Sequence, residues 1–177
     1  MEAYLFAASA GALLPAFVLL HLMELQFQRT LPAQCNQVLD ATLLLQADAI
    51  HPYLDCMGTV GRAMYLEFYV FDLVLFPIIY ATFLVGSLLR LWPTTRYLVA
   101  LPVIAAAFDI AENVGIFYLI SVFPSSSPPV ELAVSVFTRT KWLFAFLATA
   151  IVVVRCLQKA ATAVFQHRGM QSKAKSS

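Results

Sequence analysis

Charged residues are scarce in this 177-residue chain, because Asp, Glu, Lys and Arg together make up 12% of it, against about 25% in ordinary soluble domains. The 11 basic and 10 acidic residues leave a formal net charge of +1, which gives no electrostatic case for nucleic acid as a partner. Hydrophobic residues make up 61%, and the mean hydropathy is +0.80. This composition predicts an integral membrane protein, with the lipid bilayer as its first partner.

Several motifs that carry enzyme or metal chemistry are also missing. The sequence has no Gly-x-Ser-x-Gly elbow for a nucleophilic serine and no closely spaced cysteines for structural zinc, although His51 lies near Cys56. We therefore expect no metal and no cofactor. No Asn-x-Ser/Thr glycosylation site is present, so glycosylation gives no information about orientation.

Four long apolar runs predict an all-α, polytopic bundle of four transmembrane helices. A helix needs about 20 largely apolar residues to cross the hydrocarbon core, and four segments qualify: residues 3–24, 65–89, 97–122 and 132–156. Residues 1–160 then form one transmembrane domain, and residues 161–177 form a basic tail. A cleaved signal peptide is the alternative for the first run, but its basic start and its small-residue cleavage site are missing.

Basic residues are distributed unevenly between the two sides of such a bundle. If the N-terminus is cytosolic, that side carries Arg90, Arg96, Arg155, Lys159, Arg168, Lys173 and Lys175. The other side carries only Arg29, Arg62, Arg139 and Lys141. The positive-inside rule then predicts that both termini are cytosolic and that the long first loop, residues 25–63, is extracytoplasmic.

That first loop contains Cys35 and Cys56, so a disulfide between them is expected in an oxidising compartment, with two unpaired thiols as the alternative. Residues 38–49 predict an amphipathic helix on the membrane surface, because Leu39, Leu43 and Leu44 fall on one side. Gly58 and Gly61 then lead into the second span, where they permit either a tight turn or simply the start of a helix.

The sequence ends Lys173-Ala-Lys175-Ser-Ser. This ending resembles the Lys-x-Lys-x-x signal by which coat proteins return membrane proteins to the endoplasmic reticulum. A chance match in a basic, serine-rich end is the alternative. With a cytosolic tail, the resemblance predicts location in the endoplasmic reticulum.

The few polar residues inside the spans gather on particular helix faces. Arg62, Tyr65, Tyr69, Asp72 and Tyr80 share one face of the second span, and the spacing i, i+3, i+4 aligns Asp109, Glu112 and Asn113 in the third. His21 and Glu24 end the first span, and Arg139 and Lys141 lie in the fourth. Charges inside a bilayer cost several kcal/mol unless they are paired, protonated or hydrated. We therefore expect these side chains to face the bundle interior and to contact one another.

Two interpretations of this polar cluster remain open. In the first, Asp72 and Glu112 pair with Arg139 and Lys141, and the network only fixes helix order in a structural or assembly subunit. In the second, carboxylates outnumber basic partners, so one of them is protonated or binds a lipid-derived or cationic small molecule. An acid–base enzyme acting on a lipid or sterol through His21, Asp109 and Glu112 is a variant of the second.

Small residues suggest helix contacts as well. The stripes Ala3, Ala7, Gly11 and Ala107, Ala111, Gly115 have the spacing that lets helices approach closely, within the chain, in a homo-oligomer or in a membrane complex. Transport through Asp109 would require such an oligomer, because four spans form only a small pathway.

The polar motifs also suggest a family. Gly61-Arg62-x-x-Tyr65, then Tyr69-x-x-Asp72-x-x-x-x-Pro77-x-x-Tyr80, and later Asp109-x-x-Glu112-Asn113 resemble a group of small four-span membrane proteins of uncharacterised function. The resemblance covers about residues 55–120. It implies a similar helical bundle with these polar residues as its characteristic positions, and it implies no activity. The four-span sterol isomerase and sigma-2-like group shares only the architecture, because its motifs do not align with this chain.

Overall fold

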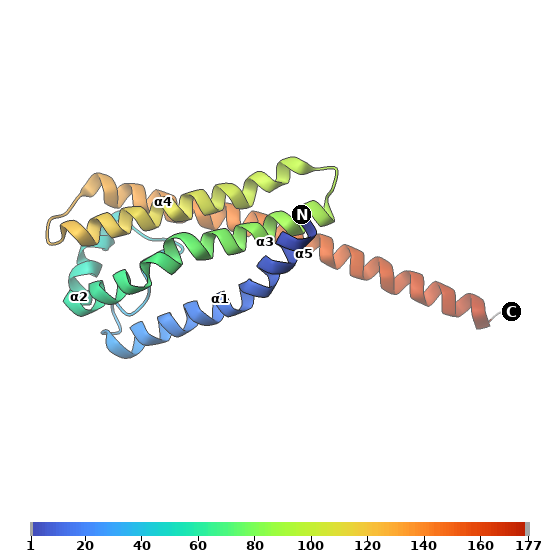
Figure 1. Cartoon of the computed structure of the whole chain (residues 1–177), viewed down its shortest axis with the longest axis horizontal. Coiled ribbons are helices and arrows are strands. Elements are labelled where there is room, and N and C mark those ends of the chain that lie inside the picture. Colours follow the sequence, from blue (N-terminus) through green and yellow to red (C-terminus); the bar gives the residue numbers. More distant parts are fainter. Residues whose placement is uncertain (1, 176–177) are drawn as a thin grey trace.

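The computed structural model describes the backbone of residues 2–175 and the side chains of residues 6–39, 41–67 and 71–163. In that part of the chain every regular element is helical (Figure 1). The long helices are α1 (Glu2–Thr30), α2 (Ala47–Val70), α3 (Phe76–Leu91), α4 (Ala100–Val122) and α5 (Pro128–Lys175). Three short helical segments join them: η1 (Leu39–Ala41), η2 (Phe71–Leu75) and η3 (Arg96–Val99).

Four segments are long and apolar enough to cross a membrane, which confirms the predicted all-α bundle of four spans. They are Phe6–Thr30, Phe71–Leu91, Arg96–Val122 and Pro128–Ala163. The first span runs further than predicted, because α1 continues to Thr30. Helix α5 continues to Lys175, so the predicted tail is an extension of the fourth helix as far as the structure describes it.

The two ends of the bundle differ in character (Figure 1). The N-terminus and the projecting part of α5 lie at one end, which we call the tail end. At the other end, residues 31–58 and the α4–α5 connection at residues 123–127 form a folded layer, which we call the cap. Helix α4 packs mainly along α5, and α1 packs mainly along α3.

The cap contains much of the buried apolar core. Leu39, Ile50 and Leu54 are fully buried there, together with Phe27 on α1 and residues of α4 and α5 such as Ile116. The spans, by contrast, expose many large apolar side chains, including Leu14 and Phe17 on α1, as expected for surfaces that face lipid. Apolar burial therefore holds the cap together as a folded unit, and the first loop is not a flexible connection.

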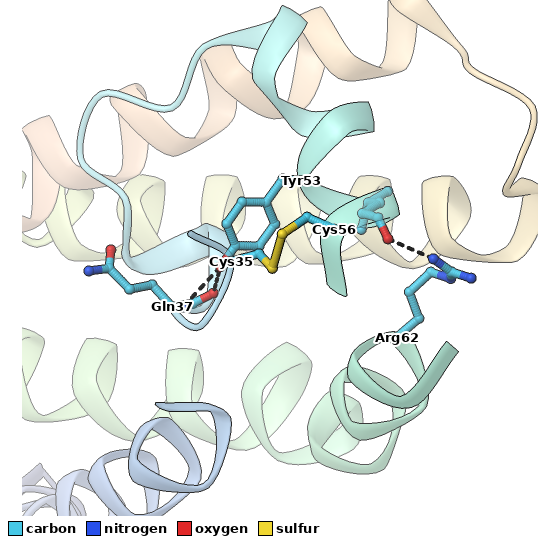
Figure 2. The surroundings of a disulfide bond; sticks show 6 residues. Cys35, Gln37, Tyr53, Cys56 and Arg62 are labelled. Carbon is cyan, nitrogen blue, oxygen red and sulfur yellow. Dashed lines mark hydrogen bonds between the residues drawn. A yellow bond between two sulfur atoms is a disulfide. The ribbon is translucent and has the colours of Figure 1, made fainter. Parts of the chain in front are cut away.

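The cap is also cross-linked (Figure 2). Cys35 and Cys56 form a disulfide with their Cα atoms 6.0 Å apart, which confirms the paired alternative. Next to it, the Tyr53 hydroxyl donates to the Gln37 carbonyl and accepts a hydrogen bond from the Gln37 N–H at 2.9 Å. The Arg62 guanidinium donates to the Leu54 carbonyl at 2.6 Å. These bonds join residues 8 to 21 positions apart in sequence and fix the path of the loop.

The predicted amphipathic helix at residues 38–49 is wrong. In this range only the single turn η1 and the first three residues of α2 are helical, and Leu43 and Leu44 are exposed whereas Leu39 and Leu45 are buried. The reason is tertiary: the Leu45 carbonyl accepts hydrogen bonds from Ser135 at 2.6 Å and from Arg139 at 3.2 Å, both on α5. These side chains anchor the loop across α5, and they replace the main-chain donor that a helix would have supplied.

Glycine is required where α2 bends. Gly58 adopts φ +63° and ψ −171°, a backbone conformation that residues with a Cβ rarely adopt. It divides α2 into two helical parts. One turn later, a Cβ on Gly61 would lie 2.8 Å from the Met57 Cβ. The tight turn, rather than a plain helix start, is therefore the role of this segment.

The two small-residue stripes have different outcomes. On α4, a Cβ added at Gly115 would lie 2.5 Å from Cγ2 of Val134, so α4 and α5 approach closely at this glycine as predicted. On α1, Gly11 is exposed and a Cβ there would have nothing within 4 Å. The α1 stripe therefore makes no close helix contact within the chain at this position.

We expect Gly115→Val to destabilise the bundle, because the new side chain must displace Val134 or separate α4 from α5. Overpacking of this kind costs about 1–3 kcal/mol. Gly11→Val is the matched control, since the same side chain there meets open space. Unfolding of both purified variants in detergent measures the difference, and equal stabilities would contradict the close α4–α5 contact.

Thiol labelling tests the cross-link in the cap. The chain has three cysteines, and Cys156 is a free, exposed thiol. In the denatured protein without reductant we expect only Cys156 to react, whereas after reduction all three should react. Cys35→Ala should release Cys56 and add one reactive thiol without reductant. Labelling of all three thiols in the unreduced wild type would exclude the disulfide.

Candidate functional site

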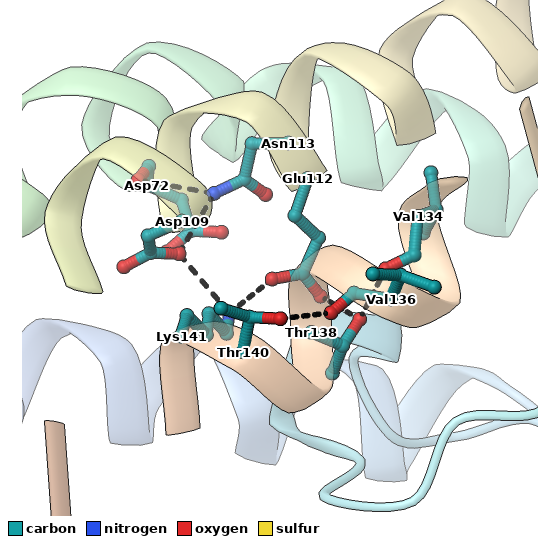
Figure 3. A network of polar contacts seen from close by, with 9 residues as sticks. All are labelled: Asp72, Asp109, Glu112, Asn113, Val134, Val136, Thr138, Thr140 and Lys141. Atoms are coloured by element: carbon teal, nitrogen blue, oxygen red, sulfur yellow. Dashed lines mark hydrogen bonds and ion pairs between the residues drawn. The ribbon is translucent and has the colours of Figure 1, made fainter. Parts of the chain in front are cut away.

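The polar stripe of α4 points into the bundle. Asp109, Glu112 and Asn113 are 5%, 0% and 3% exposed, although they lie in the middle of an apolar span. Their spacing of three and four residues places them along one face of the helix. This face is turned toward α5 and toward the junction of α2 with α3 (Figure 3). The prediction that these three residues face the interior is confirmed.

Lys141 on α5 is the cation that these carboxylates share (Figure 3). Its Nζ lies 3.0 Å from Oδ1 of Asp109 and 2.6 Å from Oε2 of Glu112, and the lysine itself is 6% exposed. The predicted contact between Glu112 and Lys141 is therefore present. Opposite charges at this distance attract strongly in a low-dielectric interior, which offsets the cost of removing them from water.

Thr138 completes the α5 side of the cluster, and sequence analysis missed it. Its hydroxyl lies 2.7 Å from Oε1 of Glu112 and 2.9 Å from the Val134 carbonyl, so its one proton is donated to either oxygen. The available signal was spacing, because a residue three positions before Lys141 shares its helix face. Thr138 was overlooked because threonine carries no charge.

Helices α4 and α5 meet in a regular antiparallel register. Val134 packs against Gly115, Thr138 contacts Glu112, and Lys141 contacts Asp109. The three α5 residues follow one another at spacings of four and three, and the three α4 residues at spacings of three. Residues with these spacings lie along one face of a helix, so the two faces pack against each other. One continuous interface therefore contains a close apolar contact, a hydrogen bond and an ion pair in succession.

Asp72 joins the cluster through an unusual backbone. It lies in η2, a π-helical turn between α2 and α3, and π-turns often mark functional positions. In π geometry its carbonyl would accept from the N–H five residues later, but that residue is Pro77, which has none. The Asn113 side chain supplies a donor instead, at 3.5 Å from the Asp72 carbonyl and 3.4 Å from Oδ1 of Asp109.

Tyr80 contributes a hydroxyl from α3, one turn after Pro77. It is half-buried, and it interacts with the carboxylates of Asp109, Glu112 and Asp72. The side chain of Tyr69 lies outside the described residues. We use the name acidic cluster for the five residues Asp72, Asp109, Glu112, Asn113 and Lys141.

Other predicted site residues lie on α2 next to the cap instead. The Arg62 guanidinium lies 3.9 Å above the ring of Phe123, at the start of the α4–α5 connection. Tyr65 is buried with its ring edge-to-face against Phe27, at 5.8 Å between centroids. Both residues therefore link α2 to its neighbours by packing and polar contacts at the cap end.

Arg139 does not take the place predicted for it beside Asp72 and Glu112. It donates to the Leu45 carbonyl at 3.2 Å, on the loop side of α5. Two positions along an α-helix are about 200° apart around its axis, so Arg139 and Lys141 point in nearly opposite directions. The prediction compared the depths of the two cations in the membrane and neglected this rotation.

The end of α1 also remains apart from the acidic cluster. His21 is exposed and Glu24 is half-buried on α1, whose main packing partner is α3. An acid–base pair between His21 and Asp109 or Glu112 therefore has no support in the geometry. In the described part of the chain, no group of three or more His, Cys, Asp and Glu side chains is arranged to hold a metal ion.

The motif residues of the suspected family divide between two places. Arg62 and Tyr65 pack at the cap end. Asp109 and Glu112 pair with Lys141, and Asn113, Asp72 and Tyr80 adjoin this pair. Comparison of the chain with known protein families, with curated proteins and with solved structures finds no match. The resemblance to small four-span membrane proteins therefore stays a prediction.

A double-mutant cycle on Glu112→Gln and Lys141→Met tests the central ion pair. Residues in direct contact typically couple by about 0.5–3 kcal/mol, and burial places this pair toward the upper part of that range. The cycle of Glu67→Gln with Lys141→Met is the control, because Glu67 is exposed on α2. Stability is measured by unfolding in detergent. A coupling energy for Glu112 and Lys141 no larger than that of the control would contradict the pair.

Proposed function

We propose that the acidic cluster binds a cationic small molecule or the cationic part of a lipid-derived molecule inside the membrane. The observation that carries this proposal is the position of Lys141, whose single ammonium group is shared by Asp109 and Glu112. Asp72 adjoins the pair through its backbone, because its carbonyl accepts a hydrogen bond from Asn113. Acidic side chains therefore outnumber the basic side chain that faces them.

The excess of carboxylates has a physical consequence. In a low-dielectric interior, carboxylates placed close together repel one another. Each of them therefore needs a proton or a nearby cation. Arg62 on α2 and Arg139 on α5 do not neutralise these carboxylates, because both donate hydrogen bonds to carbonyls of the cap. A proton or an external cation is thus the natural complement of the cluster.

The surroundings of Lys141 suit an organic ammonium group. Its Nζ lies 5.7 Å from the centroid of the Trp142 ring, so an aromatic face and two carboxylates surround one positive charge. Carboxylates and aromatic faces are the groups with which proteins recognise alkylated amines. Lys141 therefore occupies an environment that an amine ligand would also favour.

The bilayer offers a route for such a ligand. Val74 and Leu75, on the π-turn that carries Asp72, are exposed large apolar residues, as is Ile78 on the next turn. A surface of this kind faces lipid chains in a membrane. An amphiphile could keep its apolar chain against these residues and direct its charged group toward Asp72.

A structural role is the second candidate, and the ion pairs themselves favour it. Lys141 joins α5 to α4 in the interface where the two helices pack together. In that case the cluster holds the bundle, or a complex containing it, and needs no ligand. The acid–base enzyme is less favoured, because His21 is exposed on α1.

The orientation of the chain is also proposed: both termini are cytosolic and the cap is lumenal or extracellular. The N-terminus and the α5 extension share one end of the bundle (Figure 1), and the disulfide of the cap requires an oxidising compartment. Location in the endoplasmic reticulum rests on the dilysine pattern alone, and the side chains of Lys173 and Lys175 lie outside the described residues.

Native mass spectrometry of gently purified protein tests the proposed site. We expect a specific small molecule on the wild type that is lost in Asp109→Asn and Glu112→Gln. Each substitution removes one negative charge and keeps an oxygen that accepts a hydrogen bond from Lys141. Glu67→Gln, which removes an exposed carboxylate outside the cluster, should retain the molecule.

Thermal unfolding of the same samples separates binding from structure. A binding site predicts that Asp109→Asn loses the ligand while keeping most of its stability in ligand-free detergent. If no molecule is bound to the wild type and Asp109→Asn is as unstable as Lys141→Met, the cluster is structural and the proposal is overturned.

A further inference from the structure

Charge is segregated along this chain. No Asp or Glu occurs between residues 73 and 108, or after Glu131. These two stretches supply the tail end of the bundle, where Arg90 lies in the last turn of α3, Arg96 lies in η3, and Arg155 and Lys159 lie on α5. Glu2 is the one acidic side chain that the sequence adds at this end, and it lies outside the described side chains. The tail end is therefore strongly basic.

The basic residues of the tail end meet an aromatic side chain. The Arg155 guanidinium lies 4.6 Å from the centroid of the Trp92 ring, and its Nη1 donates to Gln158 at 3.2 Å. Arg155, Gln158, Lys159 and Thr162 line an open depression on this face of α5. The Thr162 hydroxyl donates to the Gln158 carbonyl at 2.9 Å, which leaves two cations and a side-chain amide as groups suited to the oxygens of a phosphate.

Two hydrogen-bond donors at this place have no acceptor. Nε1 of Trp92 and Nε of Arg155 are both buried without a hydrogen-bond partner in the described part of the chain. A buried donor left in this state destabilises the folded protein. Arg155 lies over the Trp92 ring and also lines the depression, so both donors belong to the edge of this polar surface.

The position of these residues matches the headgroup layer of a membrane. Trp92 directly follows the apolar span Phe71–Leu91, and tryptophan is enriched at membrane interfaces. Arg155 lies at the level of Trp92, because the two side chains are in contact. Lys159 lies one helical turn further out, about 6 Å along α5. The donors thus lie where lipid phosphates lie, just beyond the hydrocarbon core.

We propose that Arg155, Lys159 and Trp92 form a binding site for the phosphate of an anionic phospholipid at the tail end. The site is separate from the acidic cluster, and neither proposal depends on the other. A membrane lipid fits better than a soluble phosphate compound, because the site combines phosphate-binding groups with an interfacial tryptophan at the end of a span. The basic excess favours lipids with a net negative charge.

Lipid binding to the full-length protein in detergent tests this proposal, with phosphatidylglycerol and phosphatidylcholine of the same chain length as probes. Native mass spectrometry should show phosphatidylglycerol bound at least about tenfold more tightly, as expected for two basic side chains near one headgroup. Arg155→Gln and Lys159→Gln should each reduce that preference severalfold. Trp92→Phe, which keeps the aromatic ring and loses the N–H, should reduce it less.

Arg29→Gln is the matched control, because Arg29 is exposed near the cap end and loses the same charge. If Arg29→Gln weakens phosphatidylglycerol binding as much as Lys159→Gln, only net charge matters and the site is excluded. If Arg155→Gln does not fold, phosphatidylglycerol binding is compared between Lys159→Gln and Arg29→Gln, because Lys159 is exposed and its substitution disturbs no packing. If millimolar inorganic phosphate displaces the lipid, the site belongs to a soluble anion and the lipid assignment fails.

Discussion

One buried ammonium group, that of Lys141, determines how the two best-packed helices fit together. An uncompensated charge inside a membrane protein is costly, and removing one partner of a buried pair typically costs about 3–5 kcal/mol. Lys141 is compensated only where α5 places it between Asp109 and Glu112. That requirement fixes both the rotation and the depth of α5 against α4. The contact of Thr138 with Glu112 and of Val134 with Gly115 then follows from the same register.

The other side of α5 has a different partner, and this explains why so short a chain folds into a defined bundle. Ser135 and Arg139 point away from the acidic cluster and bind the Leu45 carbonyl of the first loop. The loop is held further by the Cys35–Cys56 disulfide and by the buried core around Phe27 and Ile50 (Figure 2). Helices in lipid gain little hydrophobic driving force from packing, so an apolar core formed where the loop meets the ends of the spans supplies it.

The elements that depend on local pattern were predictable from the sequence, and those that depend on distant contacts were not. Hydropathy located four spans, and the spacing of Asp109, Glu112 and Asn113 placed them on one buried face. The amphipathic pattern at residues 38–49 failed, because contacts with α5 outweighed a weak helical preference. Arg139 was misplaced because depth was compared without rotation, and no local signal indicated the π-turn that brings the Asp72 carbonyl to Asn113.

The distribution of charge explains why the acidic cluster and the basic tail end are independent. Lys141 and Arg155 are fourteen residues apart on one helix, which corresponds to about 21 Å at 1.5 Å per residue. Direct contact across that distance is excluded, so the carboxylates of the cluster cannot neutralise the arginines of the tail end. Each charge must be balanced locally. Within the span Lys141 supplies part of this balance for Asp109 and Glu112, and a cationic ligand would supply the rest under the proposal made above. At the membrane boundary the proposed lipid phosphates would have the same role for Arg155 and Lys159.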